Sequence, residues 1–254
     1  MTCTLLEKLD LPKSCWLGSV IYKKQFLTAG DLSSADKKLV SKHIDKVIWH
    51  ASLKPNTINI RPYQDEAREY GEVEIIEVRL NEASQVRRIA EIVMRTIPYP
   101  ILLQLTLEEK LMIVAGHSRI NLSDSSKNTI EEFLFTDWIN PGALTEFQIQ
   151  FFENIHSSKL SFLNFYLLYN SFVDQVILLN ASKWADCYFG SKDVQEVKKI
   201  TIRIANLERK VEELRTALKQ ETQFNRQVEL NVSLKRVQKE KEYLVRDYLI
   251  AKRS

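Results

Sequence analysis

The chain of 254 residues is 44% hydrophobic and 27% charged, so it is long enough and apolar enough to bury a core. Its six glycines and six prolines argue against disorder and against a glycine-rich nucleotide loop. The net charge of +3 does not by itself indicate nucleic-acid binding, but the basic surplus lies at the two ends. Residues 193–254 carry 15 basic and 10 acidic side chains, and residues 71–192 are acidic.

The cysteines and the apolar runs exclude several classes of protein. Cys3, Cys15 and Cys187 are scattered and odd in number, so they predict neither a disulfide framework nor a zinc knuckle. The N-terminus lacks a charged-then-apolar leader, and no segment reaches the roughly 18 uncharged apolar residues of a membrane helix. We therefore expect a cytoplasmic protein that does not contact a membrane.

Residue type and spacing predict the N-terminal elements. Residues 16–28 favour a short strand or a hairpin-like entry. Residues 33–53 predict a helix that ends at Pro55, and residues 56–60 predict a strand. The helix is predicted because apolar side chains recur at three- and four-residue steps, at Leu39, Val40, His43, Ile44, Val47 and Ile48.

The central block is the clearest fold signal. Residues 72–80 predict a strand, residues 83–97 a helix, and residues 100–108 and 110–120 two strands joined by a tight turn. Residues 130–140 predict a last strand. The order strand, helix, hairpin predicts a small mixed sheet with helices on one face.

The C-terminal third is helical in character. Residues 145–155 and 160–189 predict aromatic-rich helices, and the stretch that follows carries a heptad seam. The seam runs through Ile200, Ile204, Leu207, Val211, Leu214 and Leu218, and it resumes two residues out of phase at Leu230, Leu234, Val237, Lys241, Leu244 and Tyr248. A single seam tolerates insertions of three or four residues, so we expect an antiparallel helical hairpin that turns near residues 221–226 rather than one continuous rod.

Together these elements predict an α+β protein in three parts. Residues 1–140 form the α/β domain, residues 141–192 a helical packing region, and residues 193–254 the coiled-coil hairpin.

Several segments together resemble a bacterial family of unknown function, number 4391. They are LPKS (11–14), VIWHASLKPNTINI (47–60), EVEIIEVRL (72–80), IPYPILLQL (97–105) and KQETQFNRQVELNVSLKR (219–236). The resemblance implies no activity. It implies a context, because such proteins are similar to those encoded beside helicases and DNA methyltransferases in restriction and phage-defence clusters.

A metal-dependent nuclease is one functional alternative. Such a site needs clustered carboxylates, for which Asp65, Glu72, Glu74 and Glu77 are the candidates. Arg79 occupies the position where such sites usually carry a lysine, and arginine cannot act as a base. No spacing of histidines or cysteines predicts a metal site, so we expect no metal and no cofactor.

Duplex DNA is a second candidate ligand. The candidate phosphate contacts are Lys37, Lys38, Lys42 and Lys46, expected along one exposed helix, and Arg226, Lys235, Arg236 and Lys239 on the terminal helices. The alternative is a solvated face on which nearby glutamates balance the lysines.

Partner binding is the interpretation we favour. Gln223, Phe224 and Asn225 lie at the expected turn, where an exposed Phe224 would anchor a partner, unless it covers the hairpin's own core. We therefore expect a non-enzymatic accessory subunit of a bacterial anti-phage or restriction-like complex that holds a helicase or DNA methyltransferase. A homodimer remains open.

Overall fold

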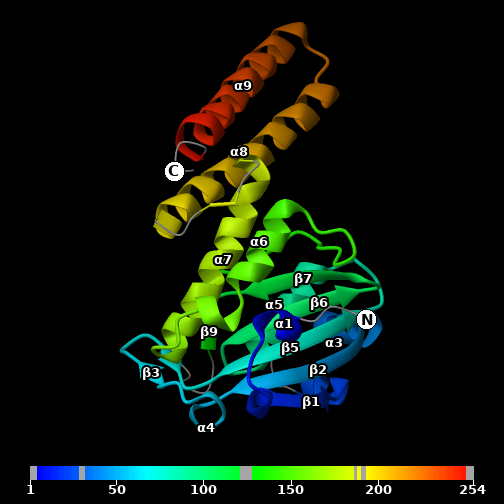
Figure 1. Ribbon diagram of the computed structural model, residues 1–254. Helices are drawn as coiled ribbons and strands as arrows, with labels where there is room; N and C mark the ends of the chain where they lie inside the picture. Colours follow the sequence, from blue (N-terminus) through cyan, green and yellow to red (C-terminus); the bar gives the residue numbers. More distant parts are fainter. Residues whose placement is uncertain (1–4, 29–31, 121–127, 186–187, 190–192, 250–254) are drawn as a thin grey trace. The chain divides into compact units, whose positions relative to one another are not determined.

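The computed structural model describes residues 5–28, 32–120, 128–185, 188–189 and 193–249 of the chain. These residues fold into two compact units that divide between Val176 and Ile177, inside helix α7 (Phe165–Ala185). The limits expected from the sequence lie instead after residues 140 and 192. The α+β class is confirmed: a mixed sheet is followed by a helical C-terminal region (Figure 1).

A six-stranded mixed sheet forms the centre of the first unit, with the strand order β1-β2-β5-β6-β7-β10. Only β5 and β6 are parallel, and helix α5 (Val86–Thr96) connects them. All other neighbours are antiparallel. The strands are β1 (Trp16–Ile21), β2 (Ile44–Leu53), β5 (Val73–Leu80), β6 (Ile101–Leu107), β7 (Lys110–Ala115) and β10 (Leu134–Phe135).

Smaller elements surround this sheet. Two ribbons pair β3 (Tyr63–Gln64) with β4 (Glu69–Tyr70) and β8 (Ser118–Ile120) with β9 (Asn128–Ile130). The remaining helices that lie wholly in this unit are α1 (Leu5–Leu9), η1 (Lys13–Cys15), α2 (Lys23–Thr28), α3 (Ser34–His43), α4 (Pro55–Ile58), α6 (Glu146–Asn154) and η2 (Ser157–Lys159).

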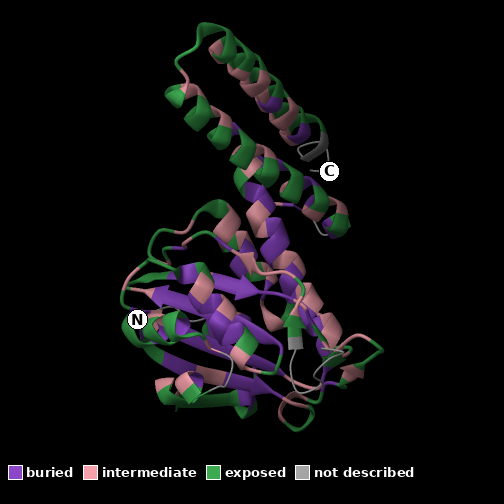
Figure 2. Ribbon diagram, turned by 180° about the vertical axis from the view of Figure 1, so that it is seen from behind, coloured by how far each residue is buried: buried purple, intermediate pink, exposed green. Residues whose placement is uncertain are grey.

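One face of the sheet carries the main hydrophobic core. Alternate residues of β5 and β6, such as Ile76 and Leu103, pack against the apolar side of α5 and against Val40 of α3. Figure 2 shows these central strands as buried. Seven of the eight residues of β5 are buried, including Glu74 and Glu77, so this strand is covered on both faces.

The second face is covered by α1, whereas the sequence predicted helices on one face only. The backbone N–H of Leu5 donates to Oε1 of Gln104 at 2.6 Å. Because Gln104 alternates with Leu103 along β6, its side chain lies on the face opposite the α5 core. Helix α6 packs beside α1 and contributes the buried Phe151 and Phe152.

The helix predicted over residues 33–53 is wrong beyond His43. Ser33 caps α3 by accepting from the N–H of Asp36, and at Ile44 the chain enters β2, which pairs with β1 on one side and β5 on the other. The register of β2 shifts after Ile44 and again after Trp49. These bulges interrupt the two-residue alternation, so the buried positions acquire the three- and four-residue spacing of a helix.

Three other local expectations change. Residues 56–60 were predicted as a strand, but Pro55 begins α4, which ends at the left-handed Asn59 (φ 55°). Residues 23–28 form α2 rather than a continuation of β1. The strand predicted over residues 110–120 divides into β7 and β8. The strand predicted over residues 130–140 divides into the last residue of β9, strand β10 and a single bridge at Ile139.

The second unit contains the predicted antiparallel hairpin, which is confirmed. Helix α8 (Val194–Gln220) and helix α9 (Phe224–Tyr243) are joined by three residues, and a π-helical turn (Leu244–Leu249) follows. The predicted seam positions from Ile200 to Leu244 are the less exposed ones, and the exposed positions lie between them (Figure 2). In the described segments no helix is both long and apolar enough to cross a bilayer.

Glu221 explains how this turn forms without glycine or proline. Its Oε1 accepts from the backbone N–H groups of Thr222 and Gln223, at 2.8 and 2.9 Å. The side chain of Gln227 donates to the Glu221 carbonyl at 2.7 Å. The two N–H contacts, that of Gln223 first, lower the pKa of Glu221. Side-chain hydrogen bonds therefore satisfy the backbone groups that the helix ends leave free.

The hairpin seam gives a first prediction. Ile204 is fully buried, whereas Ile202, two residues earlier on the same helix, is exposed. We expect Ile204→Val to destabilise the hairpin by about 1 kcal/mol and Ile202→Val to change it little, because only the first removes a buried methylene. Hydrogen exchange of the α8 and α9 amides measures both, and equal effects would contradict the seam.

Candidate functional site

Glu77 is the centre of a polar cluster on the α1 face of the sheet. Its side chain is fully buried. His50 lies in the second bulge of β2, and its Nε2 is 2.8 Å from Glu77 Oε2. Arg79 Nε donates to Glu77 Oε1 at 3.0 Å. On the neighbouring strand β6, Gln104 donates through Nε2 to Thr106 Oγ1 at 3.0 Å.

The partners of Glu77 keep it ionised. Burial alone would raise its pKa, but hydrogen bonds from His50, Arg79 and Thr106, together with the charge of Arg79, lower the pKa of Glu77 to about 2. A carboxylate held in this way is an acceptor whose lone pairs are already occupied. Its surroundings describe a buried structural acceptor, paired with a half-exposed arginine, better than a proton donor or a free metal ligand.

Glu74 lies on the same strand but has the opposite electrostatic character. Burial raises the pKa of Glu74 to about 7, although Trp49 and Ser52 oppose this by donating to it. Trp49 Nε1 donates to Oε2 at 2.6 Å and Ser52 Oγ donates to Oε1 at 2.9 Å. Glu74 is three residues from Glu77, so the two side chains lie on opposite faces of the sheet and cannot act on one substrate atom.

The other two carboxylates of the nuclease alternative serve local structure. Oδ1 of Asp65 accepts from the backbone N–H groups of Ala67 and Arg68 in the β3–β4 turn. Glu72 pairs with Lys54 at 3.1 Å. Among the residues that the structure describes, no three His, Cys, Asp or Glu side chains are grouped closely enough to hold a metal ion. The four predicted carboxylates are therefore not brought together.

The predicted basic helix of the first unit is shorter than expected. Lys37, Lys38 and Lys42 are exposed on α3, and Lys42 pairs with Glu82 at 3.1 Å. Lys46 is not on this helix, which is a correction to the predicted row, because it lies on β2 opposite Arg79 of β5. The remaining predicted cations belong to the second unit.

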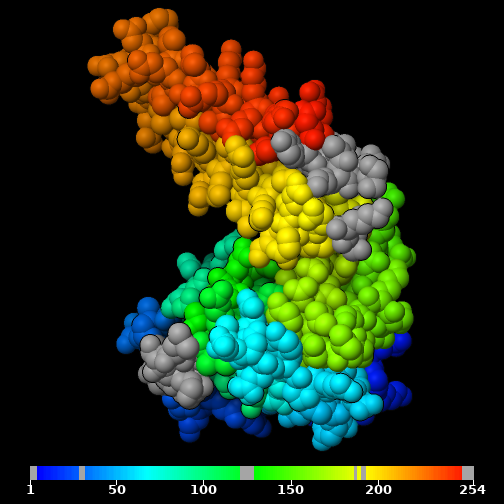
Figure 3. Space-filling model, turned by 90° about the vertical axis from the view of Figure 1, so that its left-hand side faces the viewer, coloured from blue at the N-terminus to red at the C-terminus, as the bar shows by residue number. Residues whose placement is uncertain are grey.

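The outer face of α9 is the most distinctive surface of the second unit. Phe224, Val228 and Val232 are spaced by four residues, so they share one side of the helix. Their side chains are 76%, 45% and 63% exposed. The seam residues Leu230, Leu234 and Val237 lie on the other side of α9. The side chains of α9 are at the surface in Figure 3, coloured orange to red.

Basic residues continue the same side of the helix. Lys235, Arg236 and Lys239 follow Val232 at positions that share its side, and all three are exposed. These three cations, together with Phe224, Val228 and Val232, form the outer face of α9. Arg226 lies on another side and is 3.9 Å from Glu221 at the turn. The predicted tip residues Gln223 and Asn225 are exposed beside Phe224.

Phe224 does not cover the hairpin's own core, which was the alternative considered from the sequence. Its exposure excludes that role. Val228 and Val232 were not predicted as site residues. The signal that identifies them is their spacing of four and eight residues from Phe224, which places them away from the heptad seam.

Comparison with known proteins adds one finding. No curated protein and no solved structure matches the chain. A family model does match, over residues 9–240, and that family is described as a domain of unknown function (DUF4391). The match covers most of both units, and the chain therefore belongs to this family.

Proposed function

We propose that this protein is a non-enzymatic accessory subunit that binds a partner protein through the outer face of α9. The observation that supports this most directly is the exposed row of Phe224, Val228 and Val232. The partner class that we propose is the one implied by the sequence resemblance, a helicase or DNA methyltransferase of a bacterial anti-phage or restriction-like complex.

The folding of the hairpin does not require these three side chains. Its helices are held by the seam and by ion pairs on the flanks, such as Arg203–Glu240 at 2.7 Å and Lys241–Glu208 at 3.3 Å. Removing a valine or phenylalanine side chain from water is worth about 1.5–3 kcal/mol. Three such side chains aligned on one helix therefore offer a partner a substantial apolar contact, with Phe224 as its aromatic anchor.

The cations on the same face define the chemistry of the partner. Lys235, Arg236 and Lys239 continue the apolar row, so the complementary surface is an amphipathic helix that presents apolar residues beside acidic ones. Duplex DNA would contact the cations through its phosphates. It would leave Phe224, Val228 and Val232 exposed to water, because phosphate contacts are made by charged and polar groups. The apolar row therefore favours a protein partner over DNA.

Co-purification with the products of neighbouring genes tests the proposal. The tagged full chain is compared with a variant carrying Phe224→Ser, Val228→Ser and Val232→Ser. Ile202→Ser is the matched control, because Ile202 is an exposed aliphatic residue of the same hairpin outside this face. We expect the triple variant to weaken capture of the partner at least about tenfold, and the control to keep it. Circular dichroism confirms that helix content is unchanged.

Two results would overturn the proposal. One is recovery of the parent chain alone, and the other is equal capture by the triple variant. A separate assay addresses the nuclease alternative. The chain is incubated with plasmid and Mg²⁺ or Mn²⁺, with Glu77→Gln as the control, and Glu77-dependent nicking would replace the accessory role by an enzymatic one.

A further inference from the structure

A second exposed apolar surface lies on the first unit, along the edge of the sheet. Strand β1 is at one end of the strand order, so β2 pairs with one of its edges, and no described strand pairs with the other. Trp16, Leu17 and Val20 on β1, and Tyr22 directly after it, are all exposed. An unpaired edge presents free backbone N–H and C=O groups, to which an extended chain can add as a further strand.

Natural edge strands are usually protected by charges, proline or bulges. β1 has only the last of these, a bulge at Gly18, whose positive φ of 64° accompanies the register shift between Trp16 and Ser19. Beyond the bulge, Ser19 to Ile21 pair regularly with β2. No charged residue or proline occurs from Trp16 to Tyr22. The outer edge of this segment is therefore open to pairing.

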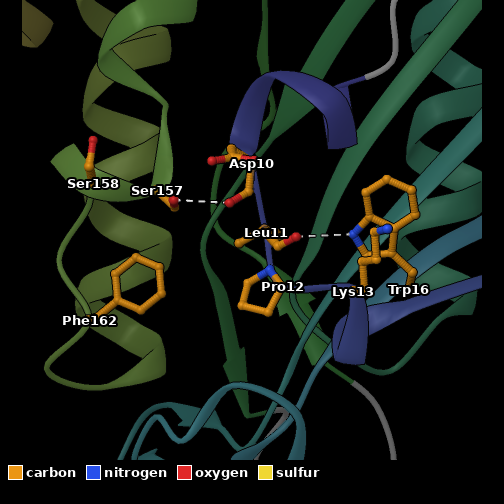
Figure 4. Close-up of a pocket in the computed structure, with 8 residues that line it drawn as sticks. All are labelled: Asp10, Leu11, Pro12, Lys13, Trp16, Ser157, Ser158 and Phe162. Carbon is orange, nitrogen blue, oxygen red and sulfur yellow. Dashed lines mark hydrogen bonds between the residues drawn. The ribbon is translucent and has the colours of Figure 1, made fainter.

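A shallow hollow adjoins the start of this strand. It has a volume of about 730 Å³. Trp16 and Lys13 line one side, Phe162 lines the other, and Leu11 and Pro12 lie between them (Figure 4). Trp16 is held in place by the hydrogen bond from its Nε1 to the Leu11 carbonyl at 3.2 Å. A strand added to β1 could place one apolar side chain in this hollow, which supplies the selectivity that backbone pairing lacks.

The charges that flank β1 indicate which kind of segment would pair with it. Three lysines flank the strand, Lys13 before it and Lys23 and Lys24 after it, and residues 11–30 contain no acidic residue. The acidic residue that lines the hollow, Asp10, pairs with His156 Nε2 at 3.2 Å. Lys23 is fixed there, because its Nζ donates to the Ile44 carbonyl at 2.6 Å. Antiparallel pairing with β1 of a second copy would bring lysines of both copies together. A segment with acidic ends would instead be complementary to the lysines.

We propose that β1 accepts an extended segment of a partner protein as an additional strand. This segment has alternating apolar residues, one of which enters the hollow beside Trp16, and acidic residues at both ends. The surface belongs to the first unit and does not depend on the outer face of α9. An accessory subunit with both surfaces could hold two chains, or two parts of one chain.

A displayed library of random peptides of about ten residues, a length typical of long strands, provides the probe. It is selected on the full-length protein, and the Kd of the selected peptide is measured by fluorescence anisotropy. The blocking variant is Val20→Lys, which places a charge on the edge, and the matched control is Ile149→Lys on α6. The two side chains are 43% and 46% exposed. A second variant, Lys13→Glu with Lys24→Glu, reverses the flanking charge.

We expect selected peptides with alternating apolar residues and acidic ends. Val20→Lys and the charge reversal should each weaken binding at least about tenfold, and Ile149→Lys should not. The peptide should protect the amides of Ser19–Ile21 from hydrogen exchange, and the triple variant of α9 should bind it like the parent. The proposal is overturned if no peptide is selected, if Val20→Lys binds as the parent does, or if the parent is a dimer that Val20→Lys dissociates.

Discussion

Replacing Glu77 with alanine is expected to lower the free energy of unfolding by about 3 kcal/mol, because it opens a cavity in a buried strand and leaves hydrogen-bond donors there without their acceptor. His50 would lose the carboxylate that lies 2.8 Å from its Nε2, and Arg79 would lose the partner of its Nε. Urea unfolding at neutral pH, followed by fluorescence, measures the change. Glu72→Ala is the control, because the pair with Lys54 is partly exposed and is worth at most about 1 kcal/mol.

The loss at Glu77 should also depend on pH. The folded state lowers the pKa of Glu77 from 4.5 to about 2, so its ionised form stabilises the fold above the unfolded pKa. That contribution is lost as the pH falls from 4.5 toward 2. The difference between parent and Glu77→Ala should therefore be full at neutral pH and shrink in acid. A difference below about 1 kcal/mol at neutral pH would contradict a stabilising role of the buried carboxylate.

Glu74→Gln is expected to have the opposite sign and to stabilise the protein at high pH. Burial raises the pKa of Glu74 from 4.5 to about 7. The wild-type residue thus stabilises the fold most below pH 4.5, and this contribution is lost as the pH rises to 7. At about 1.4 kcal/mol per pKa unit, the ionised carboxylate costs about 3 kcal/mol above pH 7.

Glutamine keeps the shape of Glu74 but carries no charge. Its amide oxygen can accept from Trp49 Nε1, and its amide nitrogen can donate to the Ser52 hydroxyl oxygen. Unfolding of parent and variant is compared at about pH 4, 6 and 8, so that all other titrating groups cancel in the difference. The stabilisation should be near zero at the lowest pH and largest at the highest. A difference that is the same at all three values would show that Glu74 does not titrate in this range.

Much of the fold could be predicted from local patterns. Strand β5, helix α5 and the turn between β6 and β7 follow from apolar periods that agree with residue propensities. The hairpin of the second unit follows from the phase of the two seams, because a slip of two residues cannot be absorbed in one coiled coil. The failure at β2 has a definite cause, since its two bulges produce a helical spacing in a strand.

The candidate sites also differ in whether the sequence predicts them. Phe224 and the basic row of α9 were predicted, because one helix brings them together through short-range spacing. The Glu77 cluster was not, because His50, Glu77 and Thr106 come from three strands that are distant in the sequence. The exposure of β1 was also not predicted, since its residue types equally suit a covered strand.

By itself, the sequence determined the elements whose stability comes from neighbours in the chain: the central strand, its crossover helix and the two helices of the hairpin. Only the tertiary structure decided that a strand follows His43, that the predicted carboxylates stay apart and which apolar side chains stay in water. The physical reason is that hydrogen bonding between strands and burial are settled by partners far along the chain, and local periodicity does not record them. Phe224 and Val20 show this clearly, because both are apolar and only the packed structure shows that each is exposed.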